Sequence, residues 1–152
     1  MPNTELIPLF EIDAQLSPIV TTGNTPGGEI RLIAINGGTF AGELLRGEIL
    51  PGGADWQDVR SDGGLEISAR YLLRTDQQEI VEVRSVGLRV APPEVLEKLA
   101  RGELVPMDQY YFRTAVRLRT AAERLRRLND VLAISYGERR KASVHLYVYE
   151  VP

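Results

Sequence analysis

Three pairs of adjacent glycines divide residues 37–64 of this 152-residue chain into short, strand-like segments. The pairs are Gly37-Gly38, Gly52-Gly53 and Gly63-Gly64. Glycine reaches positive φ without a clash from a Cβ atom, so each pair marks a tight turn, a bulge or a sharp bend. Bends of this kind allow a sheet to curl and close, so the segment favours a barrel.

The rest of the chain alternates between apolar and polar residues as half-buried strands do. Residues 65–74 are the clearest case, because every second side chain from Leu65 to Leu73 belongs to one apolar face. The same reading predicts strands at 6–15, 29–36, 39–50, 65–74, 79–90, 110–119, 131–136 and 143–151, with a turn-rich loop at 21–28.

Two helices interrupt this rhythm. Residues 94–101 read as a short helix after Pro92-Pro93, inside a connection at 91–109 that is either a lid or a plug for one end of the core. Thr120 and Glu123 have the spacing of a capping box and predict a second helix of about two turns. The sequence therefore predicts one domain, 1–152: an antiparallel β-barrel of roughly eight to ten strands with two short helices.

The composition of the chain excludes some classes of function and argues against others. The chain has no cysteine, which excludes disulfides and thiolate chemistry, and its net charge of −3 argues against a general nucleic-acid binder. Six arginines between 113 and 127 are divided between a strand and a helix and need not form one patch. No signal peptide and no bilayer-spanning apolar run is evident, so we expect a cytoplasmic protein without membrane contact.

Common catalytic motifs are absent from the sequence, and we expect no cofactor and no metal. His145 is the only histidine, and the alternation around it favours a surface position over a cavity position. Nothing marks a nucleophile, so a Ser-His-Asp triad is not expected.

Arginines, tyrosines and a glutamate alternate with apolar residues along the central strands. They either form a solvated outer face with cross-strand charge pairs or point into the barrel, where buried arginines need an anionic partner. The residues concerned are Arg70, Tyr71, Glu82, Arg84, Tyr111, Arg113 and Arg117.

Asp55, Trp56 and Asp62 are further candidate site residues, and all three lie at positions where we expect turns. Asp62 before Gly63-Gly64 is typical of a turn aspartate that bonds its own backbone. Asp55 and Trp56 are either structural turn residues or lie at a barrel mouth, with Asp55 as a general base over a ligand.

The central block resembles the family called domain of unknown function 3237. The similarity lies in residues 37–42, 45–47, 51–57 and 60–63, and further in 69–71, 111–114 and 128–129. The resemblance implies a small β-barrel protein and no established catalytic residues. The sequence departs from the family pattern at Asp76-Gln77, where Asp-Gly is expected, and at Leu128, where a tryptophan is expected.

The leading hypothesis is a barrel that binds a small carbonyl or carboxylate compound, often aromatic, as a cofactor-free isomerase, lyase or cyclase. The expected catalytic residues are Asp55, Glu82, Arg113 and Tyr111, and the expected ligand-binding residues are Trp56, Arg70, Tyr71, Arg84, Arg117 and His145. The alternative is a non-catalytic carrier or a structural module that assembles through residues 91–109. In both cases we expect a homo-oligomer.

Overall fold

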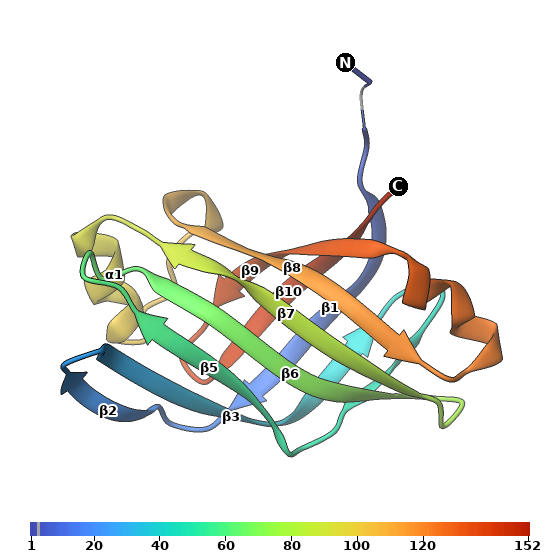
Figure 1. Ribbon diagram of the computed structural model, residues 1–152, viewed down its shortest axis with the longest axis horizontal. Helices are drawn as coiled ribbons and strands as arrows, with labels where there is room; N and C mark the ends of the chain where they lie inside the picture. The colour runs from blue at the N-terminus through green and yellow to red at the C-terminus, as the bar shows by residue number, and fades with distance from the viewer. Residues whose placement is uncertain (3) are drawn as a thin grey trace.

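The structure is a computed structural model that describes residues 1–2 and 4–152 (Figure 1). Its strands are β1 (Ile7–Leu16), β2 (Val20–Thr25), β3 (Gly28–Ala41), β4 (Arg46–Ile49), β5 (Gly53–Val59), β6 (Leu65–Thr75), β7 (Ile80–Val90), β8 (Tyr111–Thr120), β9 (Leu132–Arg139) and β10 (Ser143–Val151). Its helices are α1 (Pro93–Ala100) and two 3-10 helices, η1 (Met107–Gln109) and η2 (Glu123–Asp130).

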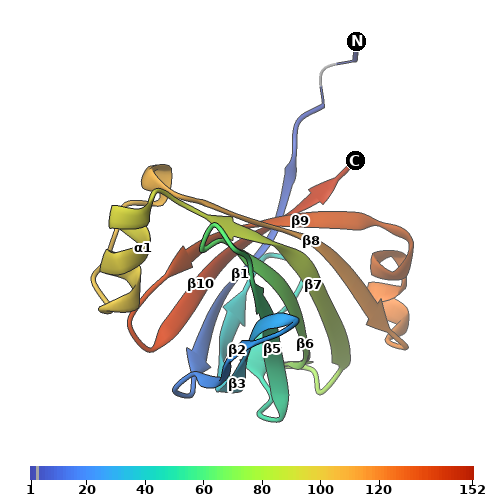
Figure 2. The same ribbon diagram turned by 60° about the vertical axis from the view of Figure 1, so that its left-hand side comes forward.

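The strands close into an antiparallel barrel, as predicted. From β6 the order runs through β7, β8, β9 and β10 to β1, and β1 pairs in turn with β3. Strands β4 and β5 together occupy one place in the wall, because each pairs with β3 on one side and β6 on the other. The wall therefore has eight positions, and β2 lies outside it on β3. Figure 2 shows the curled sheet, with α1 and η2 at opposite ends.

Three segments differ from the prediction. The expected loop at 21–28 contains strand β2, and Gly37-Gly38 lie inside one long strand, β3, instead of separating two. Asp55 and Trp56 belong to strand β5 and not to a turn. Sequence alone could not show this, because glycines mark a bend equally well inside a strand and between strands.

Aliphatic side chains fill most of the barrel. The inner faces of β6, β7 and β8 contribute alternate residues such as Leu73, Val83 and Leu118, all nearly inaccessible to solvent. One end is closed by η2, which buries Leu125 and Leu128. The leading hypothesis placed charged and polar side chains inside the barrel, but most of the interior is apolar. Polar space is confined to the other end.

The helices follow the prediction in place but not in detail. Helix α1 begins one residue before its predicted start and buries Val95 and Leu99. The predicted capping box is wrong, because η2 has no side-chain cap. The Thr120 hydroxyl instead accepts a hydrogen bond from the Ala122 amide, and Asn129 Oδ1 accepts one from the Thr120 amide. Within the described residues, no helix is long and apolar enough to cross a bilayer.

Gly38 permits the contact that closes the barrel. Its φ is +131°, a region that side chains disfavour, and it pairs with Ala14 of β1. A Cβ atom added there would lie 2.1 Å from the Asp13 carbonyl oxygen. Strand β3 can therefore approach β1 this closely only because position 38 has no side chain.

We predict that Gly38→Ala lowers the free energy of unfolding by at least about 2 kcal/mol, through backbone strain and overpacking. Urea denaturation measures the change. Gly27→Ala is the matched control, since the nearest atom to its added Cβ is the Thr25 hydroxyl oxygen at 3.9 Å. Equal stability of the two variants would show that the contact does not close the barrel.

Candidate functional site

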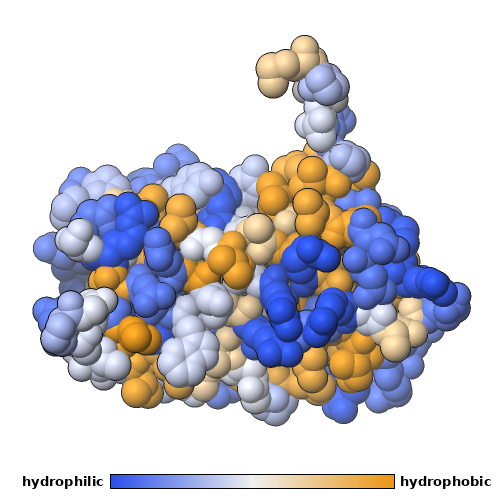
Figure 3. All heavy atoms as spheres, viewed as in Figure 1, coloured by the Kyte–Doolittle hydropathy of each residue, from blue (hydrophilic) through white to orange (hydrophobic). Residues whose placement is uncertain are grey.

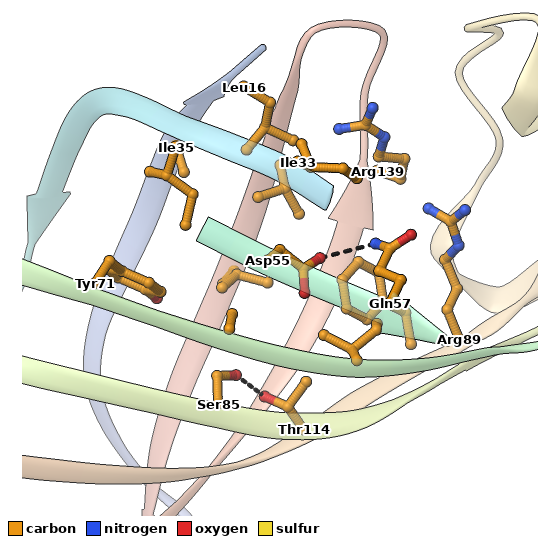
Figure 4. A pocket seen from close by; sticks show the side chains of 16 residues that line it. Leu16, Ile33, Ile35, Asp55, Gln57, Tyr71, Ser85, Arg89, Thr114 and Arg139 are labelled. Carbon is orange, nitrogen blue, oxygen red and sulfur yellow. Dashed lines mark hydrogen bonds between the residues drawn. The ribbon is translucent and has the colours of Figure 1, made fainter. Parts of the chain in front are cut away.

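A cavity of about 50 Å³ lies inside the barrel (Figure 4), and its lining residue Arg89 stands near the end of β7 that leads to α1. A space of this size holds a few water molecules when closed, by the usual requirement of roughly 10–15 Å³ for each. Most of the side chains in its wall are apolar, and a few are polar or charged. The lining residues that matter below are Asp55, Gln57, Tyr71, Ser85, Arg89, Thr114 and Arg139.

Asp55 is the one carboxylate among the residues that line the cavity. It points inward from β5 beside Gln57, whose Nε2 donates a hydrogen bond of 2.8 Å to Asp55 Oδ2. Asp55 Oδ1 is buried and has no hydrogen-bond partner among the described residues. Burial raises the pKa of Asp55 from 3.8 to about 6, although Gln57, Arg89 and Arg139 act in the opposite direction. A carboxyl group with this pKa can exchange a proton near neutral pH.

Arg89 and Arg139 bring positive charge to the same cavity from the ends of β7 and β9. Burial lowers the pKa of Arg89 to about 10, helped by repulsion from Arg139, and burial lowers the pKa of Arg139 as well. Arg89 Nε is buried without a hydrogen-bond partner, whereas Arg139 Nη1 donates a hydrogen bond of 3.3 Å to the Ser143 carbonyl oxygen. Both arginines are half-buried, and neither forms an ion pair within residues 1–2 and 4–152. One carboxylate therefore shares the cavity with two guanidinium groups, which leaves an excess of positive charge there.

Tyr71 and the remaining wall define the shape of the cavity. Burial raises the pKa of Tyr71, with Asp55 adding to the effect, so its hydroxyl stays neutral. Ile33, Ile35 and Phe112 supply apolar walls. The wall therefore offers apolar contacts and, at the arginine end, positive charge that suits an anionic group, and a ligand larger than a few water molecules requires this partly open cavity to widen.

Several predicted site residues lie on the outer face of the barrel instead. Arg70, Arg84 and Arg119 surround Glu82, with hydrogen bonds of 2.8 to 3.2 Å from each guanidinium. Figure 3 shows hydrophilic side chains gathered on this face. Burial would raise the pKa of Glu82, but hydrogen bonds from Arg70 and Arg119 lower it below its usual value. The expectation that these residues line the interior is corrected: they form a cross-strand charge cluster.

The other predicted residues are also outside the cavity. Trp56 is 54% exposed, and Arg117 is exposed on β8. His145 lies on the outer face of β10, opposite the core residues Leu146 and Val148, but its side chain is only 16% exposed and its Nε2 lies 3.0 Å from Glu11 Oε2. Tyr111 and Arg113 line a wide, open groove beside η1, where the Arg113 guanidinium lies over the Tyr111 and Tyr136 rings.

Of the residues predicted for the site, Asp55 and Tyr71 line the cavity. Gln57, Arg89 and Arg139 also line it but were not predicted. Arg89 has the same parity as Val81 and Val83 in β7, so strict alternation could have placed it inside. Asp62 is a turn aspartate, as expected, and its Oδ1 accepts a hydrogen bond from the Gly64 amide. No group of three acidic or histidine side chains suited to a metal occurs in the described part of the chain.

Comparisons with known proteins agree on family and fold. Residues 4–151 match a family described as protein of unknown function, DUF3237. The chain is 35% identical over 150 residues to the UPF0311 protein RPA1785 of Rhodopseudomonas palustris, covering 99% of this chain and 98% of that protein. It is 36% identical over 143 residues to the UPF0311 protein blr7842 of Bradyrhizobium diazoefficiens, covering 94% and 93%.

Solved structures show the same barrel. The crystal structure of RPA1785 superposes with a TM-score of 0.93 at 34% identity, covering 100% of this chain and 99% of the other. A β-barrel-like protein from Acinetobacter baumannii gives 0.86 at 35% identity, covering 100% and 98%. A protein from Penicillium herquei described as an enzyme gives 0.75 at 19% identity, covering 100% and 98%, and therefore shares the fold alone.

The raised pKa of Asp55 predicts a pH-dependent effect of Asp55→Asn. The folded chain holds this proton more tightly than the unfolded chain, so its contribution to stability is full below about pH 4 and is lost as the pH rises through about 6. Two pKa units correspond to about 3 kcal/mol. Asp55→Asn should therefore raise the free energy of unfolding by up to that amount at pH 8 and little at pH 4.

Urea denaturation at both pH values measures this difference. Asp58→Asn, on the exposed face of the same strand, is the matched control and should show no such pH dependence. A difference between Asp55→Asn and wild type that stays constant with pH would contradict a raised pKa for Asp55.

Proposed function

This chain belongs to the DUF3237 family of proteins of unknown function, and we propose that it binds a small carbonyl or carboxylate compound, often aromatic, in the barrel and moves a proton on it. The observation that carries the proposal is the unequal charge in the cavity. Asp55 faces Arg89 and Arg139, and neither arginine has an ion-pair partner among the described residues. A buried cation needs an anionic partner, and a ligand carboxylate or enolate supplies one.

The two arginines hold the anionic group and Asp55 carries the proton. In a ligand with a carbonyl group, the Asp55 carboxylate removes a proton from the carbon beside the carbonyl. The electron pair of that C–H bond moves to the carbonyl oxygen and forms an enolate, which Arg89 and Arg139 stabilise. The protonated Asp55 then returns the proton to another position of the enolate. This sequence is an isomerisation, and it needs no cofactor.

One observation supports this class of reaction. The pKa of Asp55, about 6, lies close to neutral pH, where one group can both take and return a proton. Cytoplasmic location and assembly into a homo-oligomer stay predictions.

We predict that the wild-type protein accelerates hydrogen exchange into levulinate, a keto acid, in D₂O. Proton NMR follows the loss of signal beside the ketone. Asp55→Asn should slow the protein-dependent rate by roughly 10²–10⁴-fold, the usual contribution of a positioned acid-base group. Glu82→Gln, which changes a carboxylate on the outer face, is the matched control and should retain the rate.

The same experiment separates the proposal from its rivals. Binding of levulinate by calorimetry without accelerated exchange would indicate a carrier and overturn the catalytic part. Equal loss of exchange in Asp55→Asn and Glu82→Gln would place the chemistry elsewhere.

Binding of an anion depends on the arginines. We predict that Arg89→Met and Arg139→Met each weaken benzoate binding by at least about tenfold, equivalent to about 1.4 kcal/mol. Calorimetry measures the affinity. Arg113→Met is the control, because Arg113 lies at the outer groove. Unchanged benzoate affinity in both cavity variants would contradict an anion site inside the barrel.

A further inference from the structure

Three hydroxyl groups form a chain in the barrel wall beside the cavity. Ser85 Oγ lies 2.6 Å from Thr114 Oγ1, which in turn lies 2.6 Å from Ser135 Oγ. Ser85 and Thr114 line the cavity, whereas Ser135 lies behind them and is fully buried. Figure 4 shows the first of these hydrogen bonds at the cavity wall.

The glycine at position 87 makes this arrangement possible. Gly87 of β7 is directly opposite Thr114 of β8, and a Cβ atom there would lie 2.6 Å from Thr114 Cα. Without that side chain, Thr114 can reach Ser85, two residues away along β7. The chain of hydroxyls therefore crosses three neighbouring strands, β7, β8 and β9.

A count of hydroxyl hydrogens shows which of the three hydroxyl groups can keep a hydrogen that no hydrogen bond uses. Three hydroxyls have three hydrogens, and two hydrogen bonds use two of them. If the unused hydrogen were on Ser135, it would be buried with no acceptor among the described residues, which costs about 1–3 kcal/mol. In the arrangements that avoid this cost, Ser85 or Thr114 keeps the unused hydrogen. Both line the cavity, so the wall offers a hydrogen-bond donor to its contents.

We propose that this chain of hydroxyls binds an acceptor oxygen on the ligand, at the end away from its anionic group. The inference rests on the proposed function and narrows its substrate class. The ligand is a flat or compact apolar body with a carboxylate or enolate near Arg89 and Arg139 and a second oxygen, such as a ketone or ether, near Ser85.

The separation of Arg89 from Ser85 sets the length of the ligand. The two residues lie on the same strand, β7, four positions apart. That is about 13 Å along the strand, and less between side chains that converge inside a barrel. A benzene ring with substituents in para positions spans a distance of this order.

The test compares two ligands of similar shape, para-acetylbenzoate and para-isopropylbenzoate, with benzoate as the reference. Calorimetry measures their affinities for the wild type. The ketone should bind about five- to tenfold more tightly than the isopropyl compound, as one hydrogen bond provides. Ser85→Ala/Thr114→Val removes both cavity-facing hydroxyls and should abolish this preference while retaining benzoate binding.

The matched control is Thr75→Val. Thr75 is also a buried inward threonine, but it lies near the other end of the barrel and donates to Glu79. This variant should keep the preference for the ketone even if it is less stable.

The outcomes separate the two proposals. If benzoate binds the wild type but the ketone has no advantage, or keeps its advantage in Ser85→Ala/Thr114→Val, the hydroxyl chain is structural and this inference fails alone. If benzoate does not bind the wild type at all, both the anion site and this inference fail. If Ser85→Ala/Thr114→Val does not fold, the wild-type comparison of the two para compounds still decides.

Discussion

The partial burial of Asp55 with Arg89 and Arg139 at one end of a mainly aliphatic barrel is the constraint on which the candidate site depends. Moving charged groups out of water is unfavourable unless partners compensate for the lost hydration. Here the compensation is incomplete, because Asp55 Oδ1 and Arg89 Nε have no hydrogen-bond partner among the described residues. A fold selected for stability alone would fill this end with aliphatic side chains, as it fills the other. The unmatched charges are the basis of the proposal that a ligand completes them.

The outer face shows the contrast. Glu82 is buried more completely than Asp55, Arg89 or Arg139, yet three guanidinium groups satisfy it, and the pKa of its carboxyl is lowered. Its interactions are complete without any other molecule. Asp55 has the opposite environment, and its pKa is raised. The two carboxylates therefore differ in their surroundings: guanidinium groups surround Glu82, whereas Asp55 Oδ1 has no hydrogen-bond partner among the described residues.

The barrel and the direction of most side chains could be predicted from the sequence, because a period of two is easily recognised where one face is apolar. In 65–75 and 111–120 the predicted faces agree with the observed burial. The site was harder to predict for a physical reason. Arg89 follows the inward parity of Val81 and Val83, but an arginine at an inward position is equally consistent with a strand end that has left the core, since Gly87 to Val90 are all half-buried. Arg139 lies beyond the predicted strand at 131–136, because β9 continues to Arg139.

Arg70 and Glu82 alternate regularly with apolar residues, and the leading hypothesis placed them inside the barrel. Such alternation is typical of a strand with one solvated face. Asp55 and Tyr71 do line the cavity, yet the argument that led to Asp55 placed it at a turn. What the sequence could not provide is the closure of β3 on β1, which brings residues from distant strands around one space.

A crystal structure with bound para-bromobenzoate tests the central claim most directly, because the anomalous signal of bromine locates the ligand. We predict one site inside the barrel, with the carboxylate within hydrogen-bond distance of Arg89 and Arg139 and the ring between Ile33 and Phe112. Bromine found only at the outer groove by Tyr111 and Arg113, with the barrel cavity empty, would contradict the account.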